Sequence, residues 1–126
     1  MRNLDLLAAQ TAQQIITDTT SFKSTEVDNL TTKALGVLQE NGVYAAILFL
    51  YSRSSTDAKI APSVRKSLLG LAAQEVLSQP APADQPQMAL KFVTDHICND
   101  LDILLLVKQV WEQTLIYVRY GAKARG

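Results

Sequence analysis

The stretch VYAAILFLYSR, from Val43 to Arg53, decides the fold class. Its apolar residues follow one another without the polar positions that give a surface helix a single apolar stripe. Such a helix is typical of the centre of a helical protein, where other helices cover it. We expect its middle residues to form the core: Ala45, Ile47, Leu48, Phe49 and Leu50. The run is too short to span a bilayer, which takes about 20 apolar residues.

Helical periodicity continues on the N-terminal side of this stretch. Apolar residues recur at three- and four-residue spacing from Leu4 to Ile16, with Asn3 as the expected N-cap. The hydroxyl-rich TDTTSFKST that follows favours a connection, since hydroxyl side chains compete for backbone hydrogen bonds. A second helix should begin near Ser24 or Thr25 and end at Asn41-Gly42, where glycine adopts the left-handed conformation.

The C-terminal half predicts three more helices. Ser52 to Asp57 reads as a polar break, and Pro62 suits the first turn of a fourth helix that ends before Gln79. The segment QPAPADQP, residues 79–86, holds three prolines and predicts an exposed loop. The fifth helix should carry an apolar stripe: Met88, Ala89, Phe92, Val93 and Ile97.

Asn99 or Asp100 should cap a long last helix that ends at Gly121. One side of it should hold Leu101, Leu104, Leu105, Lys108, Trp111, Leu115 and Val118. The sequence therefore predicts an all-α protein, a compact single-domain bundle of about six helices over residues 1–126. It also predicts an exposed proline-rich loop near 79–86 and a short basic C-terminal tail.

Composition limits the function classes. The 126 residues favour one domain, and 12 basic against 12 acidic residues give net charge zero, so no overall field attracts nucleic acid. A single Cys98 excludes an intrachain disulfide, and with a single His96 it leaves too few ligands for a structural zinc site. We expect no metal, no cofactor and a cytoplasmic location. The start MRNLDLLAAQ resembles neither a signal peptide nor an anchor.

Catalytic groupings are almost absent from the sequence. It contains no phosphate-cradling glycine loop, no HExxH and no G-x-S-x-G, so we expect no enzyme activity. His96 and Asp100 are four residues apart and could offer two metal ligands, but a helix break at Asn99 favours a partly buried or capping histidine. Cys98 is better explained as a small buried residue.

The aromatic residues of the last helix leave two interpretations open. Trp111, Tyr117 and Tyr120 could form a stacking platform for bases. Aromatic residues at helical spacing are more often part of a core or an interface.

Two basic segments stand out on this neutral chain. From Arg53 to Lys66 four basic residues accompany one acid, Asp57, and from Gln113 to the end three basic residues accompany none. They are either solvated helix ends or contacts for phosphate groups. The candidate RNA-binding residues are Arg53, Lys59, Arg65, Lys66, Arg119, Lys123 and Arg125.

The block KALGVLQENGVYAAILFLYSRS, from Lys33 to Ser54, resembles the small-subunit family of type III-B (Cmr-type) CRISPR–Cas effector complexes. The similarity is carried by Asn41, Gly42, Ala45, Ala46, Phe49 and Leu50. The last helix, LLLVKQVWEQTLIYVRYGAKA, is similar to the family's terminal helix in length and in its alanine-and-basic ending. Two features depart from the family: one basic residue, Arg119, stands where adjacent basic residues are typical, and the proline-rich loop is longer.

The resemblance implies a non-catalytic helical subunit that acts in antiviral defence. Several copies would stack along the complex beside the crRNA-bearing subunits and help to hold the target RNA. The implied partners are the other effector subunits, copies of the chain itself and the backbone of the target RNA/crRNA duplex. A membrane or a small-molecule substrate is not implied.

Two other function classes stay open. One is a helical adaptor that joins proteins and has no direct nucleic-acid role, and the other is an enzyme with a small-molecule pocket that the sequence does not indicate. Basic residues gathered on one face would favour RNA binding, whereas scattered ones would favour the adaptor.

Overall fold

The computed structural model describes residues 3–126, and within this range it contains helices and no strand. The elements are α1 (Leu4–Asp18), α2 (Ser24–Asn41), α3 (Val43–Tyr51), α4 (Ser55–Gly70), α5 (Pro86–Phe92) and α6 (Leu101–Arg125). Two π-helical segments extend them: η1 (Leu71–Val76) continues α4, and η2 (Val93–Cys98) continues α5. The predicted all-α bundle is confirmed.

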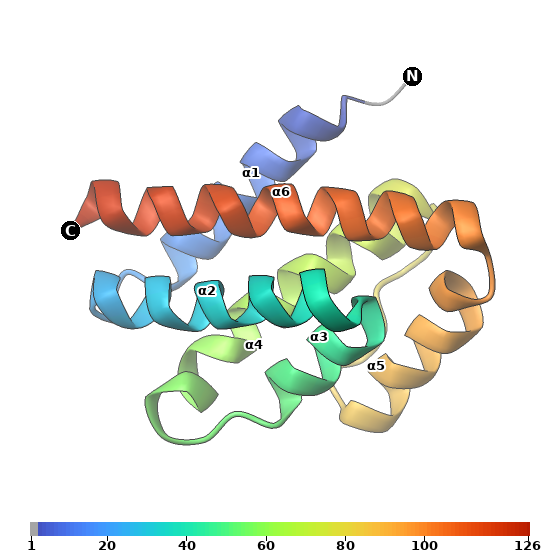
Figure 1. The fold of residues 1–126 in the computed structure, drawn as a ribbon, viewed down its shortest axis with the longest axis horizontal. Helices are drawn as coiled ribbons and strands as arrows, with labels where there is room; N and C mark the ends of the chain where they lie inside the picture. The colour runs from blue at the N-terminus through green and yellow to red at the C-terminus, as the bar shows by residue number, and fades with distance from the viewer. Residues whose placement is uncertain (1–2) are drawn as a thin grey trace.

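The longest helix, α6, runs along the whole length of the molecule (Figure 1). α2 lies beside it and runs in the opposite direction, while α1 crosses behind it. On the other side of α2 lie α3 and α4, and α5 closes the end of the molecule where α6 begins. None of the helices within residues 3–126 is both long and apolar enough to cross a membrane.

The core is centred on Trp111 of α6. Its side chain is fully buried, and its indole Nε1 donates a hydrogen bond to the Leu68 carbonyl of α4 over 2.8 Å. The other large, fully buried side chains come from every main helix except α5: Ile15, Leu30, Leu38, Ile47, Leu50, Ile60, Leu68, Ile97 and Leu115. The indole hydrogen bond thus connects α6 with α4 in the core.

α3 is packed on one side only, which corrects the expectation of a helix covered on all faces. Its buried residues are Val43, Ala46, Ile47 and Leu50. Leu48 is 47% exposed and Tyr44 40% exposed, while Ala45 and Phe49 are only partly buried. The sequence could not indicate this exposed side, because a helix without a polar face does not show which of its sides other helices cover.

Local signals place the helix ends in the first half of the chain. Asn3 caps α1 through a hydrogen bond from the Leu6 N–H to its side-chain oxygen. Gly42 has φ +98°, a conformation that favours glycine, and it separates α2 from α3. The predicted start of the second helix at Ser24 is confirmed.

Pro62 lies inside α4 and not in its first turn, because α4 already begins at Ser55. Having no N–H, this proline leaves one carbonyl of the preceding turn without its helical partner. The polar break before α4 is therefore shorter than expected and ends at Ser54. At the other end, Pro86 is the first residue of α5, so the loop between η1 and α5 ends at Gln85.

The last helix differs from its prediction in length and in orientation. Asp100 caps it as expected, accepting hydrogen bonds from the N–H groups of Asp102 and Ile103. However, α6 continues through Gly121 to Arg125, so the basic C-terminal residues are helical and do not form a tail after Gly121. Its buried face is Val107, Val110, Trp111, Thr114, Leu115, Val118 and Ala122. Three residues expected in apolar stripes are largely exposed: Met88, Leu101 and Leu105.

Candidate nucleic-acid interface

Arg65 and Lys66 of α4 share one carboxylate, that of Asp84 in the proline-rich loop. Arg65 binds it through two parallel bonds, from Nε to Oδ1 over 2.8 Å and from Nη2 to Oδ2 over 3.1 Å. The Tyr51 hydroxyl donates to Oδ1 over 2.7 Å, and Lys66 Nζ lies 3.8 Å from Oδ2. Arg65 is therefore hydrogen-bonded within the protein, whereas Lys66 is exposed and makes only a long ion pair.

This cluster shifts two pKa values. The hydrogen bonds from Arg65 hold the pKa of Asp84 below its usual range, because they favour the charged carboxylate. Burial and the adjacent Asp84 carboxylate raise the pKa of Tyr51 to about 12. At neutral pH the cluster thus consists of a carboxylate, a neutral phenol and two cations.

Two further candidates, on α6, also contact groups of the protein itself. Arg119 Nε is enclosed and makes no hydrogen bond, but Asp28 Oδ1 of α2 lies 3.5 Å away and supplies the opposite charge. Arg125 donates to the Thr19 and Phe22 carbonyls, over 3.0 and 2.7 Å, and ties the end of α6 to the turn after α1. Arg125 is better explained by this structural role than by a contact with RNA.

The other three candidates keep their charge at the surface. Arg53 stacks over the Phe49 ring at 3.8 Å, and its Nε donates to the Phe49 carbonyl. Lys59 is exposed and makes no ion pair or hydrogen bond within residues 3–126. Lys123 is exposed and lies 6.0 Å from the ring of Tyr120, which is itself 67% exposed.

The structure brings the two basic segments only partly together. The turn between α3 and α4 and the C-terminal end of α6 lie toward the same end of the long axis, with the first half of α2 between them (Figure 1). Arg65 and Lys66 lie further along α4, where they pair with Asp84. One end of the molecule thus carries Arg53, Lys59 and Lys123.

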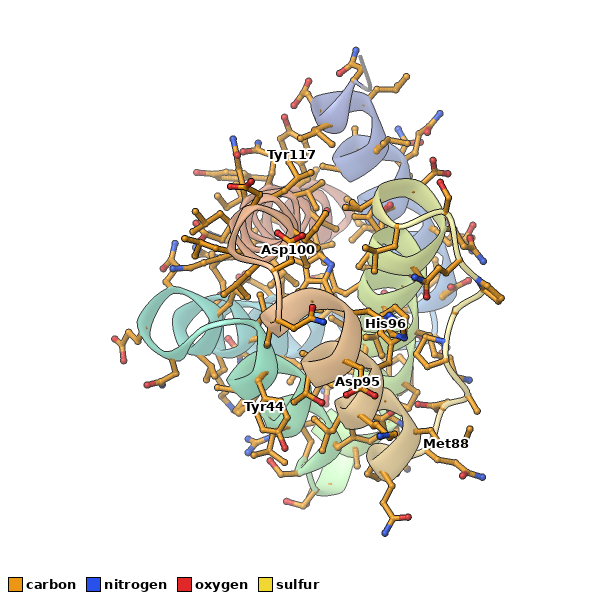
Figure 2. All side chains as sticks on the ribbon, turned by 90° about the vertical axis from the view of Figure 1, so that its right-hand side faces the viewer. Tyr44, Met88, Asp95, His96, Asp100 and Tyr117 are labelled. Carbon is orange, nitrogen blue, oxygen red and sulfur yellow. The ribbon has the colours of Figure 1, made fainter. Side chains whose placement is uncertain are left out.

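The opposite end is acidic. Between residues 94 and 102 there are three acids and no lysine or arginine: Asp95, Asp100 and Asp102. Asp95 is paired with Lys91 of α5 at 3.2 Å, so Asp100 and Asp102 carry most of this charge. All three are exposed, and Figure 2, which faces this end, shows Asp95 near His96 and Asp100 apart from them at the start of α6. α6 connects the two ends over about 37 Å, from 25 residues at 1.5 Å each.

The isolated candidates for other chemistry find separate explanations. His96 is exposed and not partly buried as expected, and its ring lies 5.2 Å from that of Phe92. Within residues 3–126 no three His, Cys, Asp or Glu side chains are grouped to hold a metal ion. Cys98 is exposed and not buried as expected, although partial burial raises its pKa.

The three aromatic residues of α6 have three different roles. Trp111 belongs to the core, Tyr117 donates a hydrogen bond to Asp5 of α1, and Tyr120 is exposed. Only Tyr120 is therefore free to stack on a base. The bond with Asp5 also raises the pKa of Tyr117.

Two grooves on the surface of residues 3–126 are lined by side chains that form no obvious catalytic group. One of about 450 Å³ between α1 and α6 is lined by small or apolar residues, among them Ala9, Ala12, Ile16 and Gly121. Another of about 410 Å³, between α1 and the α4–η1 helix, is lined largely by amides and hydroxyls, with Lys66 and Glu75 at its edge.

Sequence reasoning missed the acidic partners of the basic residues. Tyr51 lies in an apolar run and Asp84 in a proline-rich segment, so neither stands out in the sequence as a partner of Arg65. A signal did exist, because Asp84 is the only acid between Glu75 and Asp95. Its proximity to Arg65 could not be inferred, since 19 residues separate the two.

Comparisons with known proteins leave the family open. No protein-family model matches the chain, and no curated protein matches it either. The resemblance of residues 33–54 to the type III-B small subunits stays a prediction.

Proposed function

We propose that the chain is a non-catalytic helical small subunit of a type III-B CRISPR–Cas effector complex, present in several copies that contact the backbone of the target RNA. The sequence similarity of residues 33–54 and of the last helix suggests this class. The observation that carries the proposal is the polarity of charge along α6, with the exposed acids Asp100 and Asp102 where it begins and the exposed Lys123 where it ends.

Opposite charges at the two ends suit copies arranged end to end. The acids at 95, 100 and 102 of one copy would lie near the basic end of the next, and unlike charges favour that register over the reverse. A chain of zero net charge has little overall repulsion to oppose such stacking. The copies would then present their remaining basic side chains at regular intervals.

The ion pairs within the protein reduce the seven candidate RNA-binding residues to a smaller set. Lys59 and Lys123 have no acidic partner within residues 3–126, and Arg53 has only a ring and neutral oxygens around it. These three are the primary phosphate contacts of the proposal. Arg65, Lys66 and Arg119 contribute less, because an ion pair must be broken before a phosphate can replace the carboxylate.

Few contacts in each copy imply weak binding by the isolated chain. Three phosphate contacts on a neutral protein give low affinity at physiological salt, since each contact is screened and carries no sequence information. Repetition along an assembled complex raises the effective concentration of the contacts. RNA capture therefore belongs to the assembly.

Reconstitution of the effector complex tests this function. Complexes are assembled from guide RNA, the partner subunits and either the wild-type chain or the Lys59→Glu, Lys123→Glu variant. A matched variant, Lys91→Glu with Lys108→Glu, changes the net charge equally at other positions. The proposal predicts that the first variant weakens target-RNA binding by about tenfold or more and that the second binds like the wild type.

The competing function is a protein adaptor, and one observation favours it. Large apolar side chains are exposed on several helices: Leu6, Tyr44, Leu48, Met88, Leu101, Leu105 and Tyr120. Surfaces of this kind also suit contacts between subunits, so they are compatible with both functions. Unchanged RNA affinity in fully assembled Lys59→Glu, Lys123→Glu complexes would leave the adaptor as the better account.

A further inference from the structure

The groups that bind Asp84 lie on helices, whereas Asp84 itself lies in a loop. The donors come from two packed helices: Tyr51 ends α3, and Arg65 and Lys66 lie in the middle of α4. The Arg65 guanidinium is further fixed by the Leu50 carbonyl at 3.4 Å and by the Tyr51 ring at 4.2 Å. The acceptor comes from a loop, so the donors are held in place without it.

We propose that Arg65, Lys66 and the Tyr51 hydroxyl form a phosphate-binding site, and that the Asp84 carboxylate occupies this site in the closed form of the loop. A phosphate group and Asp84 then compete for the same donors. The identification of RNA as the source of that phosphate rests on the function proposed above; the site and its competition with the loop do not.

The donor set suits a phosphate better than it suits one carboxylate. A guanidinium fork binds either group through two parallel hydrogen bonds. Two cations face the single negative charge of Asp84, and Lys66 Nζ at 3.8 Å is beyond hydrogen-bonding distance. A phosphate has more oxygens to accept from Lys66 and can carry more negative charge, so it would use a donor that Asp84 leaves idle.

The loop is held in a way that permits its release. Among the described residues, the hydrogen bonds that tie residues 80–84 to other elements are those that the Asp84 carboxylate accepts from Tyr51 and Arg65. The backbone bond from the Gln85 N–H to the Ala83 carbonyl stays within the loop. A cavity of about 280 Å³, lined by Lys66, Leu69, Ala81, Pro82 and Asp84, leaves the loop incompletely packed. Opening the loop therefore costs few contacts besides those of the carboxylate.

Removal of the competing charge tests the site in the isolated chain. Asp84→Asn should bind inorganic phosphate about three- to tenfold more tightly than wild type, the range expected when a partly exposed ion pair no longer has to be broken. Asp57→Asn is the matched control, because it removes the same charge from a pair with Lys33 at 3.3 Å. Adding Arg65→Gln to Asp84→Asn should abolish the gain.

Two further measurements separate the outcomes. Circular dichroism verifies that each variant is folded. Amide hydrogen exchange at Gln79 and Gln85, whose N–H groups are hydrogen-bonded at the two ends of the loop, should quicken in Asp84→Asn and, in wild type, on adding phosphate. An RNA oligonucleotide with a 5′-hydroxyl, titrated beside inorganic phosphate, shows whether a backbone phosphodiester also binds.

Equal phosphate affinity in folded Asp84→Asn and Asp57→Asn would overturn the proposal. A gain in Asp84→Asn that survives Arg65→Gln would overturn it as well. If the gain is present and depends on Arg65, but complexes carrying Lys59→Glu and Lys123→Glu keep their RNA affinity, the phosphate site stands and the proposed function falls.

Discussion

Trp111 and Leu68 are joined by a hydrogen bond of 2.8 Å between the indole Nε1 and a backbone carbonyl, with both residues fully buried. The bond connects α6 to α4 just before the π-helical segment η1 begins. The Leu68 carbonyl also accepts the Leu71 N–H, whereas the buried indole N–H has this carbonyl as its partner. A buried donor without a partner costs more than the net value of the bond. The Trp111–Leu68 hydrogen bond therefore constrains how α6 packs against α4.

Trp111→Phe should therefore destabilise the protein by about 2–3 kcal/mol, from the lost indole volume and the lost hydrogen bond to the Leu68 carbonyl. Urea unfolding followed by circular dichroism measures the change. Phe49→Ala is the comparison: a fully buried ring would cost about 3–5 kcal/mol, but Phe49 is only half-buried and should cost about 1–2 kcal/mol. A larger loss in Phe49→Ala than in Trp111→Phe would contradict the placement of the core.

Acid should remove the stabilisation that Asp84 provides. Its folded-state pKa is lowered mainly by Arg65, so the contribution is fully present above the unfolded pKa of about 3.9 and is lost as pH falls through the folded value. Wild type should exceed Asp84→Asn in unfolding free energy by about 1 kcal/mol at pH 7. The gap should begin to shrink below about pH 4 and close as the pH falls through the lowered folded-state pKa of Asp84. A gap that stays constant from pH 7 to pH 2 would show that the carboxylate charge plays no part.

Gly121 lies where α6 passes closest to α1. A Cβ at this position would lie 3.2 Å from Ile16 Cγ1, whereas a Cβ at Gly36 in α2 would meet nothing within 4 Å. Gly36→Ala should stabilise the protein by about 0.5–1 kcal/mol through helix propensity, and Gly121→Ala should show no such gain. In an Ile16→Ala background Gly121→Ala should recover the gain. Equal effects in the wild-type background would disprove the close approach.

Ser78 turns the chain out of η1 with φ +55°, a conformation that costs an L-residue other than glycine about 1 kcal/mol. Ser78→Gly should therefore stabilise the protein by about 0.5 kcal/mol, after the entropy that glycine loses on folding is subtracted. Thermal unfolding measures this, with Ser63→Gly inside α4 as the control that should destabilise. A loss of stability in both variants would rule out the strained turn.

Sequence patterns predicted the helices well where local chemistry decides. Asn3, Gly42 and Asp100 each mark a helix end through capping or a left-handed conformation, and all three stand where expected. The predictions from Gly121 and Pro62 are wrong because tertiary packing overrides weak helix breakers. α6 continues on the surface of α1 and α2, and α4 begins about two turns before its proline.

The partners of the candidate RNA-binding residues could not be predicted from the sequence. Basic residues could be counted, but their partners come from distant parts of the chain: Asp28 lies 91 positions before Arg119, and Asp84 lies in a loop. Which cations are paired depends on how helices pack, and neither periodicity nor local charge reports that. The exposed face of α3 escaped prediction for the same reason.

The most direct test of RNA contact is the salt dependence of target-RNA binding by assembled complexes. The logarithm of affinity should fall with the logarithm of salt concentration by about 0.7 for each phosphate contact on a single strand. Complexes with Lys59→Glu and Lys123→Glu should bind more weakly and with a shallower slope than wild type, while Lys91→Glu with Lys108→Glu leaves both unchanged. The same affinity and slope in all three, with assembly intact, would contradict the account and favour the protein adaptor.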